Sequence, residues 1–181
     1  MRKIVSNLLL FLGVVCLLIS LLLFFQRYNP GRLAFAFTPF EGQISSINSS
    51  QTPKQLLISE LGINLKILPS NLQNGRWEAT TGGVSYLTLS PLPGQKGNSI
   101  LYGHNWPNLL GNLTKAKPGQ EIFIKYDDNS TKKFVINYTL EVPPTQASIL
   151  KNSTDVRVTI YTCSGFLDSK RFVVIATQSI L

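Results

Sequence analysis

The chain has 181 residues, with 17 Lys or Arg against 9 Asp or Glu, which gives a formal net charge of +8. That length leaves room for one ordinary domain and a short anchoring segment. The basic residues are scattered and match no recognisable binding motif for nucleic acid, so we expect no nucleic-acid partner; their mild excess suits a place near an anionic membrane or wall.

The first predicted element is an apolar run from Leu8 to Phe25 that contains no charged residue. It is just long enough to cross the hydrocarbon core of a bilayer as a helix. A cleaved signal peptide is the alternative, because Ala34-Phe35-Ala36 has the form of an A-x-A cleavage site. That site lies far beyond the run, and the run is longer than a usual signal-peptide core. We therefore predict an uncleaved transmembrane anchor over residues 8–25, preceded by a cytoplasmic N-terminus of residues 1–7.

Basic residues flank the predicted span on both sides, with Arg2 and Lys3 before it and Arg27 and Arg32 after it. The positive-inside rule then gives only a small preference for an N-terminus in the cytoplasm. We accordingly expect a single-pass protein of the cell membrane whose folded domain lies on the extracellular face.

Residues 26–55 are predicted to be a juxtamembrane stalk and linker. Aromatic residues recur over residues 28–40 between prolines, which fits either an interfacial aromatic belt or a loose stalk. The stretch 41–55 is rich in Ser, Asn and Gln and is typical of a flexible linker.

Residues 56–181 alternate short apolar runs with turns rich in Gly and Pro, and show no long amphipathic helical pattern. This pattern predicts an all-β sandwich or barrel. Asp-Asp-Asn-Ser at 127–130 is a hairpin signal, and its two Asp are expected to be turn residues and not metal ligands. Short helical turns are expected within 106–113 and 143–152. The expected strands span residues 56–67 with a break at Gly62, 84–90, 99–102, 121–126, 132–140, 156–163 and 172–176.

A thiol and a guanidinium are predicted to meet at one end of the last two strands. Apolar residues alternate with others from Val156 onward, which places Cys163 on the side of the strand away from the apolar row. Arg171 opens the next apolar run, so antiparallel pairing of the two runs would bring it to the same end of the sheet. A neighbouring arginine favours the thiolate, which is the nucleophilic form of cysteine.

His104 is the one histidine of the chain, and it follows an expected strand and a glycine. Its ring is therefore expected at a strand end and outside the core, where it would suit proton transfer. The other cysteine, Cys16, lies in the predicted span, so we expect no disulfide with Cys163. One histidine and one accessible cysteine cannot supply a zinc site, and we predict no metal. A small buried cysteine and a structural histidine are the alternatives to a reactive pair.

Three blocks of the domain resemble the sortase family. Residues 92–94 (Leu-Pro-Gly) and 97–104 (Gly-Asn-Ser-Ile-Leu-Tyr-Gly-His) are similar to the block that carries the family's catalytic histidine. Residues 159–163 (Thr-Ile-Tyr-Thr-Cys) are similar to its T-L-x-T-C block, with Ile in place of Leu, and Arg171 falls where the family's arginine begins the last strand. Residues 57–65 resemble the family's first strand. The blocks occur in the family's order, and the resemblance covers roughly residues 56–177.

This resemblance implies a closed eight-stranded β-barrel and a cysteine transpeptidase that needs no cofactor. Such enzymes cut a sorting signal similar to L-P-x-T-G after the Thr, hold the acyl part as a thioester and pass it to an amine. By the resemblance, Cys163 is the nucleophile, His104 the general acid/base, and Arg171 the group that positions substrate and stabilises the oxyanion. Thr162 is expected to help shape the substrate groove, and Trp106 is expected either to line that groove or to pack in the core or a turn. The implied partners are proteins with a C-terminal sorting signal, the lipid membrane, and an amine acceptor such as a cell-wall precursor or a pilin-like lysine.

The sequence also departs from parts of the family. Residues 28–55 contain no Asp-Pro-aromatic lid, so a lidded, pilin-polymerising member is not expected. The connections after residues 140 and 163 are short and leave little room for a large specificity insertion, and no acidic residues can be assigned to the calcium site of some members.

Two other classes of protein stay open. One is an L,D-transpeptidase-like or hydrolytic cysteine peptidase, although in the former Ser-x-Gly precedes the cysteine, whereas here Ser164-Gly165 follows it. The other is a non-enzymatic surface-anchored β-domain that binds a ligand, in which Cys163, His104 and Arg171 would be unrelated in space.

Overall fold

The structure is a computed structural model that describes residues 2–27, 33, 35, 51–73, 76–77 and 79–179. The chain forms two compact units, Met1–Pro30 and Gly31–Leu181. Of the predicted stalk and linker, the structure describes residues 26–27, which end α1, Leu33, Phe35 and residues 51–55. Ala34 and Ala36 of the predicted A-x-A sequence lie outside the described residues.

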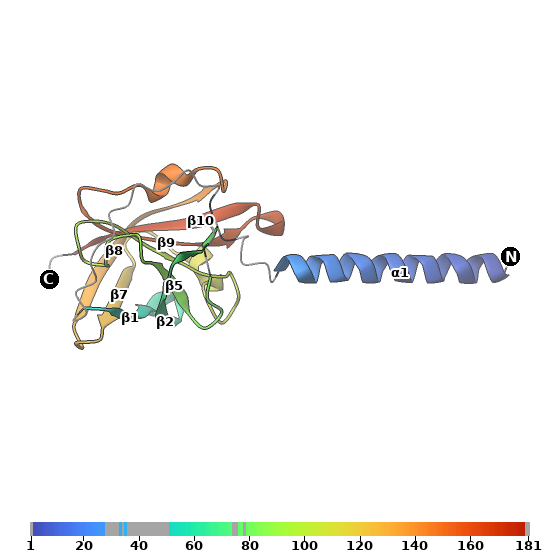
Figure 1. Cartoon of the computed structure of the whole chain (residues 1–181), viewed down its shortest axis with the longest axis horizontal. Helices are drawn as coiled ribbons and strands as arrows, with labels where there is room; N and C mark the ends of the chain where they lie inside the picture. Colours follow the sequence, from blue (N-terminus) through green and yellow to red (C-terminus); the bar gives the residue numbers. More distant parts are fainter. Residues whose placement is uncertain are drawn as a thin grey trace. The chain divides into compact units, whose positions relative to one another are not determined.

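Helix α1 (Arg2–Arg27) belongs to the first unit (Figure 1). Its segment Lys3–Phe25 is long and apolar enough to cross a membrane. These 23 residues extend about 34 Å at the rise of an α-helix, against a hydrocarbon core of about 30 Å. The predicted apolar run of residues 8–25 is helical throughout, and the helix continues past it at both ends.

Eight strands of the described residues close into a barrel, so the all-β barrel expected from the sequence is confirmed (Figure 1). Their order around the barrel is β1-β2-β5-β6-β9-β10-β8-β7, and β7 pairs with β1 to close it. The pairs β2–β5 and β6–β9 are parallel, and the other pairs are antiparallel. The strands are β1 (Pro53–Ile58), β2 (Ile63–Ser70), β5 (Val84–Leu87), β6 (Gly97–Tyr102), β7 (Glu121–Tyr126), β8 (Thr131–Val142), β9 (Val156–Ser164) and β10 (Lys170–Gln178).

Shorter elements fill the connections between the barrel strands. A separate two-stranded sheet consists of β3 (Leu72–Gln73) and β4 (Arg76–Trp77). The helical turn expected within 143–152 is present as η4, whereas the turn expected within 106–113 is followed by a 3-10 helix that continues to Lys115. The 3-10 helices are η2 (Ser59–Leu61), η3 (Gly111–Lys115), η4 (Ala147–Leu150) and η5 (Phe166–Asp168).

Several strand boundaries differ from the prediction, and two of these differences have identifiable reasons. Strand β1 begins at Pro53, inside the expected linker, because it pairs with Tyr126 at the end of β7. Strand β5 ends at Leu87 and not at Ser90, since the Leu87 carbonyl accepts hydrogen bonds from both the backbone N–H and the hydroxyl of Ser90. Both contacts depend on distant or side-chain partners that a two-residue period does not report.

The barrel sheet is packed on both of its faces. A cluster with members from every barrel strand fills the interior, and we call it the inner cluster. The outer cluster lies on the other face, and its members are Leu33, Phe35, Leu87, Ile100, Tyr102, Val142, Leu150, Tyr161, Cys163, Val173 and Ile175. Val158 and Ile160 belong to the inner cluster, so the predicted separation of Cys163 from the apolar row is confirmed. The face of Cys163 is nevertheless apolar and covered, and not the polar face that the alternation suggested.

Candidate active site

The ends of β6, β9 and β10 lie side by side, because β9 stands between the other two strands in the barrel. The parallel register pairs Tyr102 of β6 with Tyr161 of β9, and the antiparallel register pairs Cys163 of β9 with Arg171 of β10. His104 follows Tyr102 by two positions, as Cys163 follows Tyr161, so the parallel register brings His104 to the level of Cys163. The predicted nucleophile, acid/base and arginine are thus delivered to one end of three adjacent strands.

Hydrogen bonds between β9 and the segment that follows β6 continue past Tyr102, the last residue of β6. The Gly103 N–H donates to the Tyr161 carbonyl at 3.3 Å, and the Thr162 hydroxyl donates to the Gly103 carbonyl at 2.8 Å. Thr162 is fully buried, so it offers no exposed side-chain surface to the groove it was expected to line. Its observed contact instead holds the residue before His104 against β9.

Cys163 lies in apolar surroundings, with 4% of its surface exposed. The neighbouring Tyr161 ring stacks on Tyr102 with centroids 5.5 Å apart, and Phe35 meets Tyr161 edge-on at 5.0 Å. Burial raises the pKa of the Tyr161 hydroxyl well above its ordinary value. Phe35 falls in the segment expected to be a stalk, so a residue far from the site in sequence helps to cover the face that carries the thiol.

His104 stands just beyond the end of β6, as predicted, but its side chain is largely buried, with 8% exposed. The imidazole stacks on the Trp106 ring with centroids 4.5 Å apart and an interplanar angle of 13°. The His104 carbonyl accepts a hydrogen bond from the Leu110 N–H at 3.1 Å. Burial lowers the pKa of His104 below its ordinary value, and the Asp168 carboxylate opposes this change by raising the pKa.

Trp106 is half-buried and begins a tight turn after His104. Its carbonyl accepts hydrogen bonds from the Leu109 and Gly111 N–H groups, both at 2.9 Å. A Cβ atom at Gly111 would lie 2.7 Å from that carbonyl oxygen, so the turn requires glycine there. The stack on His104 is the contact observed for Trp106, and lining of a substrate groove stays a prediction.

Arg171 is 3% exposed and opposite Cys163 in the register. Its Nη1 donates to the Asp168 carbonyl at 3.0 Å and to the Lys170 carbonyl at 2.9 Å. These two bonds tie the guanidinium to the main chain at the end of the β9–β10 connection.

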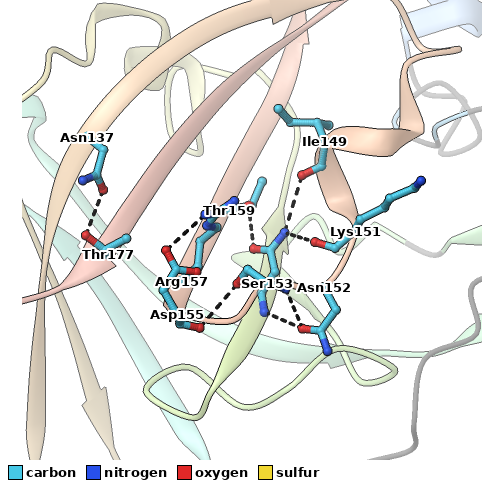
Figure 2. Close-up of polar contacts among 10 residues, drawn as sticks. Asn137, Ile149, Lys151, Asn152, Ser153, Asp155, Arg157, Thr159 and Thr177 are labelled. Atoms are coloured by element: carbon cyan, nitrogen blue, oxygen red, sulfur yellow. Dashed lines mark hydrogen bonds and ion pairs between the residues drawn. The ribbon is translucent and has the colours of Figure 1, made fainter.

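The connection between β8 and β9 is held over the sheet by Asn98, which is fully buried. Figure 2 labels four residues that bond to it, Ile149, Lys151, Asn152 and Thr159. Its Oδ1 accepts from the Thr159 hydroxyl at 2.6 Å, and its Nδ2 donates to the carbonyls of Lys151 at 3.1 Å and Ile149 at 3.5 Å. Asn152 Oδ1 accepts from the Asn98 N–H at 2.9 Å. Leu150 lies in the connection so anchored and belongs to the outer cluster together with Cys163.

The sequence pattern does not mark Asn98, Phe35 and Asp168 as contributors to the site. Asn98 belongs to the segment 97–104 that resembles the histidine block, but nothing in its local sequence indicates which carbonyls it binds. Asp168 is partly buried, and its Oδ1 accepts a hydrogen bond at 3.2 Å from Nδ2 of the exposed Asn105, the residue after His104. Among the described residues, no group of three or more His, Cys, Asp or Glu could hold a metal ion.

The structure is a closed β-barrel with a cysteine, a histidine and an arginine at one end of adjacent strands. This combination is the one expected of a sortase-type barrel. The family model of the sortase domain matches residues 56–179, and the chain belongs to the sortase family. Sortase A of Listeria monocytogenes is 31% identical over 84 residues, which cover 44% of this chain and 37% of that protein. The match therefore spans little more than a third of the relative's length.

Solved sortase structures share the fold. Sortase C-1 of Actinomyces oris superposes with a TM-score of 0.61 at 23% identity, covering 70% of this chain and 73% of the other. A lid mutant of sortase A from Corynebacterium diphtheriae gives 0.62 at 22% identity, covering 77% and 76%. A sortase D5 transpeptidase of Clostridium perfringens gives 0.61 at 20% identity, covering 71% and 79%. At these identities the likeness concerns the fold.

Proposed function

We propose that this chain is a membrane-anchored transpeptidase that cleaves an L-P-x-T-G-like sorting signal and transfers the acyl part to an amine. Membership of the sortase family supports the reaction class. The observation that carries the assignment of residues is the direct pairing of Cys163 with Arg171, beside the strand end that leads to His104.

In the first half of the proposed reaction, the Cys163 thiolate attacks the carbonyl carbon of the signal's Thr. Negative charge develops on the carbonyl oxygen, and the Arg171 guanidinium on the neighbouring strand stabilises it. The bond between carbon and nitrogen then breaks as His104 gives a proton to the leaving amine. The acyl part remains on Cys163 as a thioester.

In the second half, the acceptor amine attacks the thioester carbon, His104 takes a proton from that amine, and Cys163 leaves as a thiolate. One amide bond is thereby exchanged for another, and no oxidant, metal or cofactor is consumed. The stack of His104 on Trp106 limits rotation of the imidazole, so the ring keeps one orientation for both proton transfers.

We further propose that residues 8–25 stay in the mature protein as the anchor and that the catalytic barrel lies on the extracellular face. The length and apolar composition of α1 support the anchor, and the positive-inside rule, applied to Arg2 and Lys3, supports the orientation. Protease added to intact cells should release the barrel, and its protection would contradict the orientation. A mature protein that starts at Phe37 would show that the segment is a cleaved signal.

Mass spectrometry of the full chain mixed with a panel of sorting-signal peptides tests the reaction. The wild type should carry an acyl adduct on Cys163 that an amine discharges, and Cys163→Ala should carry none. His104→Ala and Arg171→Ala should each lower transfer by several orders of magnitude, as expected when groups act as a unit. Turnover by Cys163→Ala would refute the mechanism. Release of free acid regardless of amine would identify a hydrolytic peptidase, and absence of both adduct and turnover would favour a binding domain.

A further inference from the structure

The connection from β9 to β10 touches both the histidine-bearing segment and the arginine. Asn105, the residue after His104, donates from Nδ2 to Asp168 Oδ1 at 3.2 Å. The main-chain carbonyl of the same Asp168 accepts from Arg171 Nη1 at 3.0 Å. One residue therefore bridges the two chain segments that flank Cys163, using its side chain toward one and its main chain toward the other.

The backbone around Asp168 has an unusual conformation that places it there. Leu167 and Asp168 have φ angles of 50° and 59°, and Gly165 precedes them at 75°. Glycine adopts such angles readily and aspartate tolerates them, but leucine seldom does. Strained backbone of this kind persists where the surrounding structure over-determines it, and such places are concentrated at functional sites.

We propose that Asp168 is a positioning residue for the transfer reaction: its carboxylate holds His104 in readiness to carry a proton, while its main-chain carbonyl orients Arg171. This inference rests on the proposed function and adds to it a residue that acts through the histidine and the arginine. The proton leaves Cys163, stays on His104 and passes to the leaving amine, and Asp168 takes up no proton in this sequence of steps.

By strand register, Cys163 on β9 and Arg171 on β10 lie at the level of His104, and the connection between those strands adds Asp168. Its own segment adds the uncharged Trp106 ring and the Asn105 amide. Burial lowers the pKa of His104, and the Asp168 carboxylate raises it. The carboxylate therefore favours the imidazolium, which is the form that must give up a proton to the leaving amine.

The single histidine of the chain makes this inference directly measurable, because the imidazole signal in an NMR titration belongs to His104 alone. We would titrate the full chain in detergent micelles, in a Cys163→Ala background that removes the coupled thiol. Asp168→Asn and Asp168→Gly both suit a positive φ and keep the main-chain carbonyl that binds Arg171. Asp127→Asn is the matched control, since Asp127 makes an exposed ion pair with Lys54 at the far β7–β8 hairpin.

Both Asp168 variants should lower the pKa of His104 by a similar amount, and Asp127→Asn should leave it unchanged. An unchanged pKa in the Asp168 variants would overturn the inference, as would an equal fall in the control. This measurement needs no turnover. The inference and the proposed function can therefore fail separately: absence of transfer in the wild type contradicts the function, whereas the titration alone decides whether Asp168 acts on His104.

Where the wild type does transfer, the pH profile of kcat/KM gives a second readout, measured in protein that retains Cys163. The limb that follows His104 should move to lower pH in Asp168→Asn, and the limb that follows the thiol should stay in place. If His104 titrates below the thiol, the plateau should fall tenfold for each pH unit by which that limb moves. A loss of transfer with neither limb displaced would indicate a merely structural role and refute the inference.

Discussion

Replacing Asn98 by Ala should destabilise the domain more than any loss of exposed polar contacts could. The change deletes the hydrogen bonds to the Lys151 carbonyl and from the Thr159 hydroxyl, together with the longer contact to Ile149. Two such bonds contribute about 1 kcal/mol each, and the buried hydroxyl left without its acceptor costs about 1–3 kcal/mol more. We expect the free energy of unfolding to fall by about 3–5 kcal/mol.

Urea unfolding followed by tryptophan fluorescence would measure that change, with Asn137→Ala as a matched control. Asn137 Oδ1 also accepts a threonine hydroxyl, from Thr177 at 3.0 Å, but this pair is exposed (Figure 2). Its loss should cost no more than about 0.5 kcal/mol, as for most surface substitutions. Hydrogen exchange should show faster exchange of the η4 amides in Asn98→Ala only. An Asn98→Ala effect no larger than that of the control would refute the view that Asn98 anchors the β8–β9 connection.

Three further predictions concern the core and the strand end. Phe35→Ala should lower the free energy of unfolding in urea by about 3 kcal/mol, because Phe35 is 3% exposed. The control Phe166→Ala should change it by no more than about 0.5 kcal/mol, because Phe166 is 85% exposed. Equal effects would contradict the packing of Phe35 on the barrel. Burial raises the pKa of Tyr86 from 10.0 to about 12. The stability that the neutral Tyr86 hydroxyl contributes is therefore present below pH 10 and is lost as pH rises through 12. The free energy of unfolding measured across this window should depend less on pH in Tyr86→Phe. Gly103→Ala should lower the unfolding free energy by about 1 kcal/mol and slow transfer, because a Cβ there lies 3.1 Å from the Leu110 side chain beside His104; unchanged transfer would contradict this reasoning.

The features that could be predicted from the sequence are those encoded by neighbouring residues. The two-residue period of β9, the turn after it and the apolar run of β10 identify a hairpin, and a hairpin alone fixes the pairing of Cys163 with Arg171. The Asp-Asp-Asn-Ser turn likewise gave the β7–β8 pair, and Gly62, with φ of 64°, marks the break between β1 and β2.

The position of His104 beside Cys163, in contrast, is not encoded by neighbouring residues. It depends on the parallel pairing of β6 with β9, in which the Thr162–Gly103 hydrogen bond joins residues 59 positions apart. No periodicity within either strand reports that pairing, so the sequence could associate the two residues only through the resemblance to a family. The covering of Tyr161 by Phe35 and the left-handed backbone at Leu167 were unpredictable for the same reason, because tertiary packing overrides local preference there.

The strand order has a consequence for how the molecule is assembled. β9 and β10 come last among the described strands, yet they stand between β6 and β8. A nascent chain that ends before Val156 therefore has two unsatisfied sheet edges and an open barrel, which makes it prone to associate with other chains. Folding must wait for contacts of high sequence separation, which are slow to form. The thiol reaches the level of the imidazole only when closure occurs, so a partly synthesised chain carries no assembled nucleophilic centre.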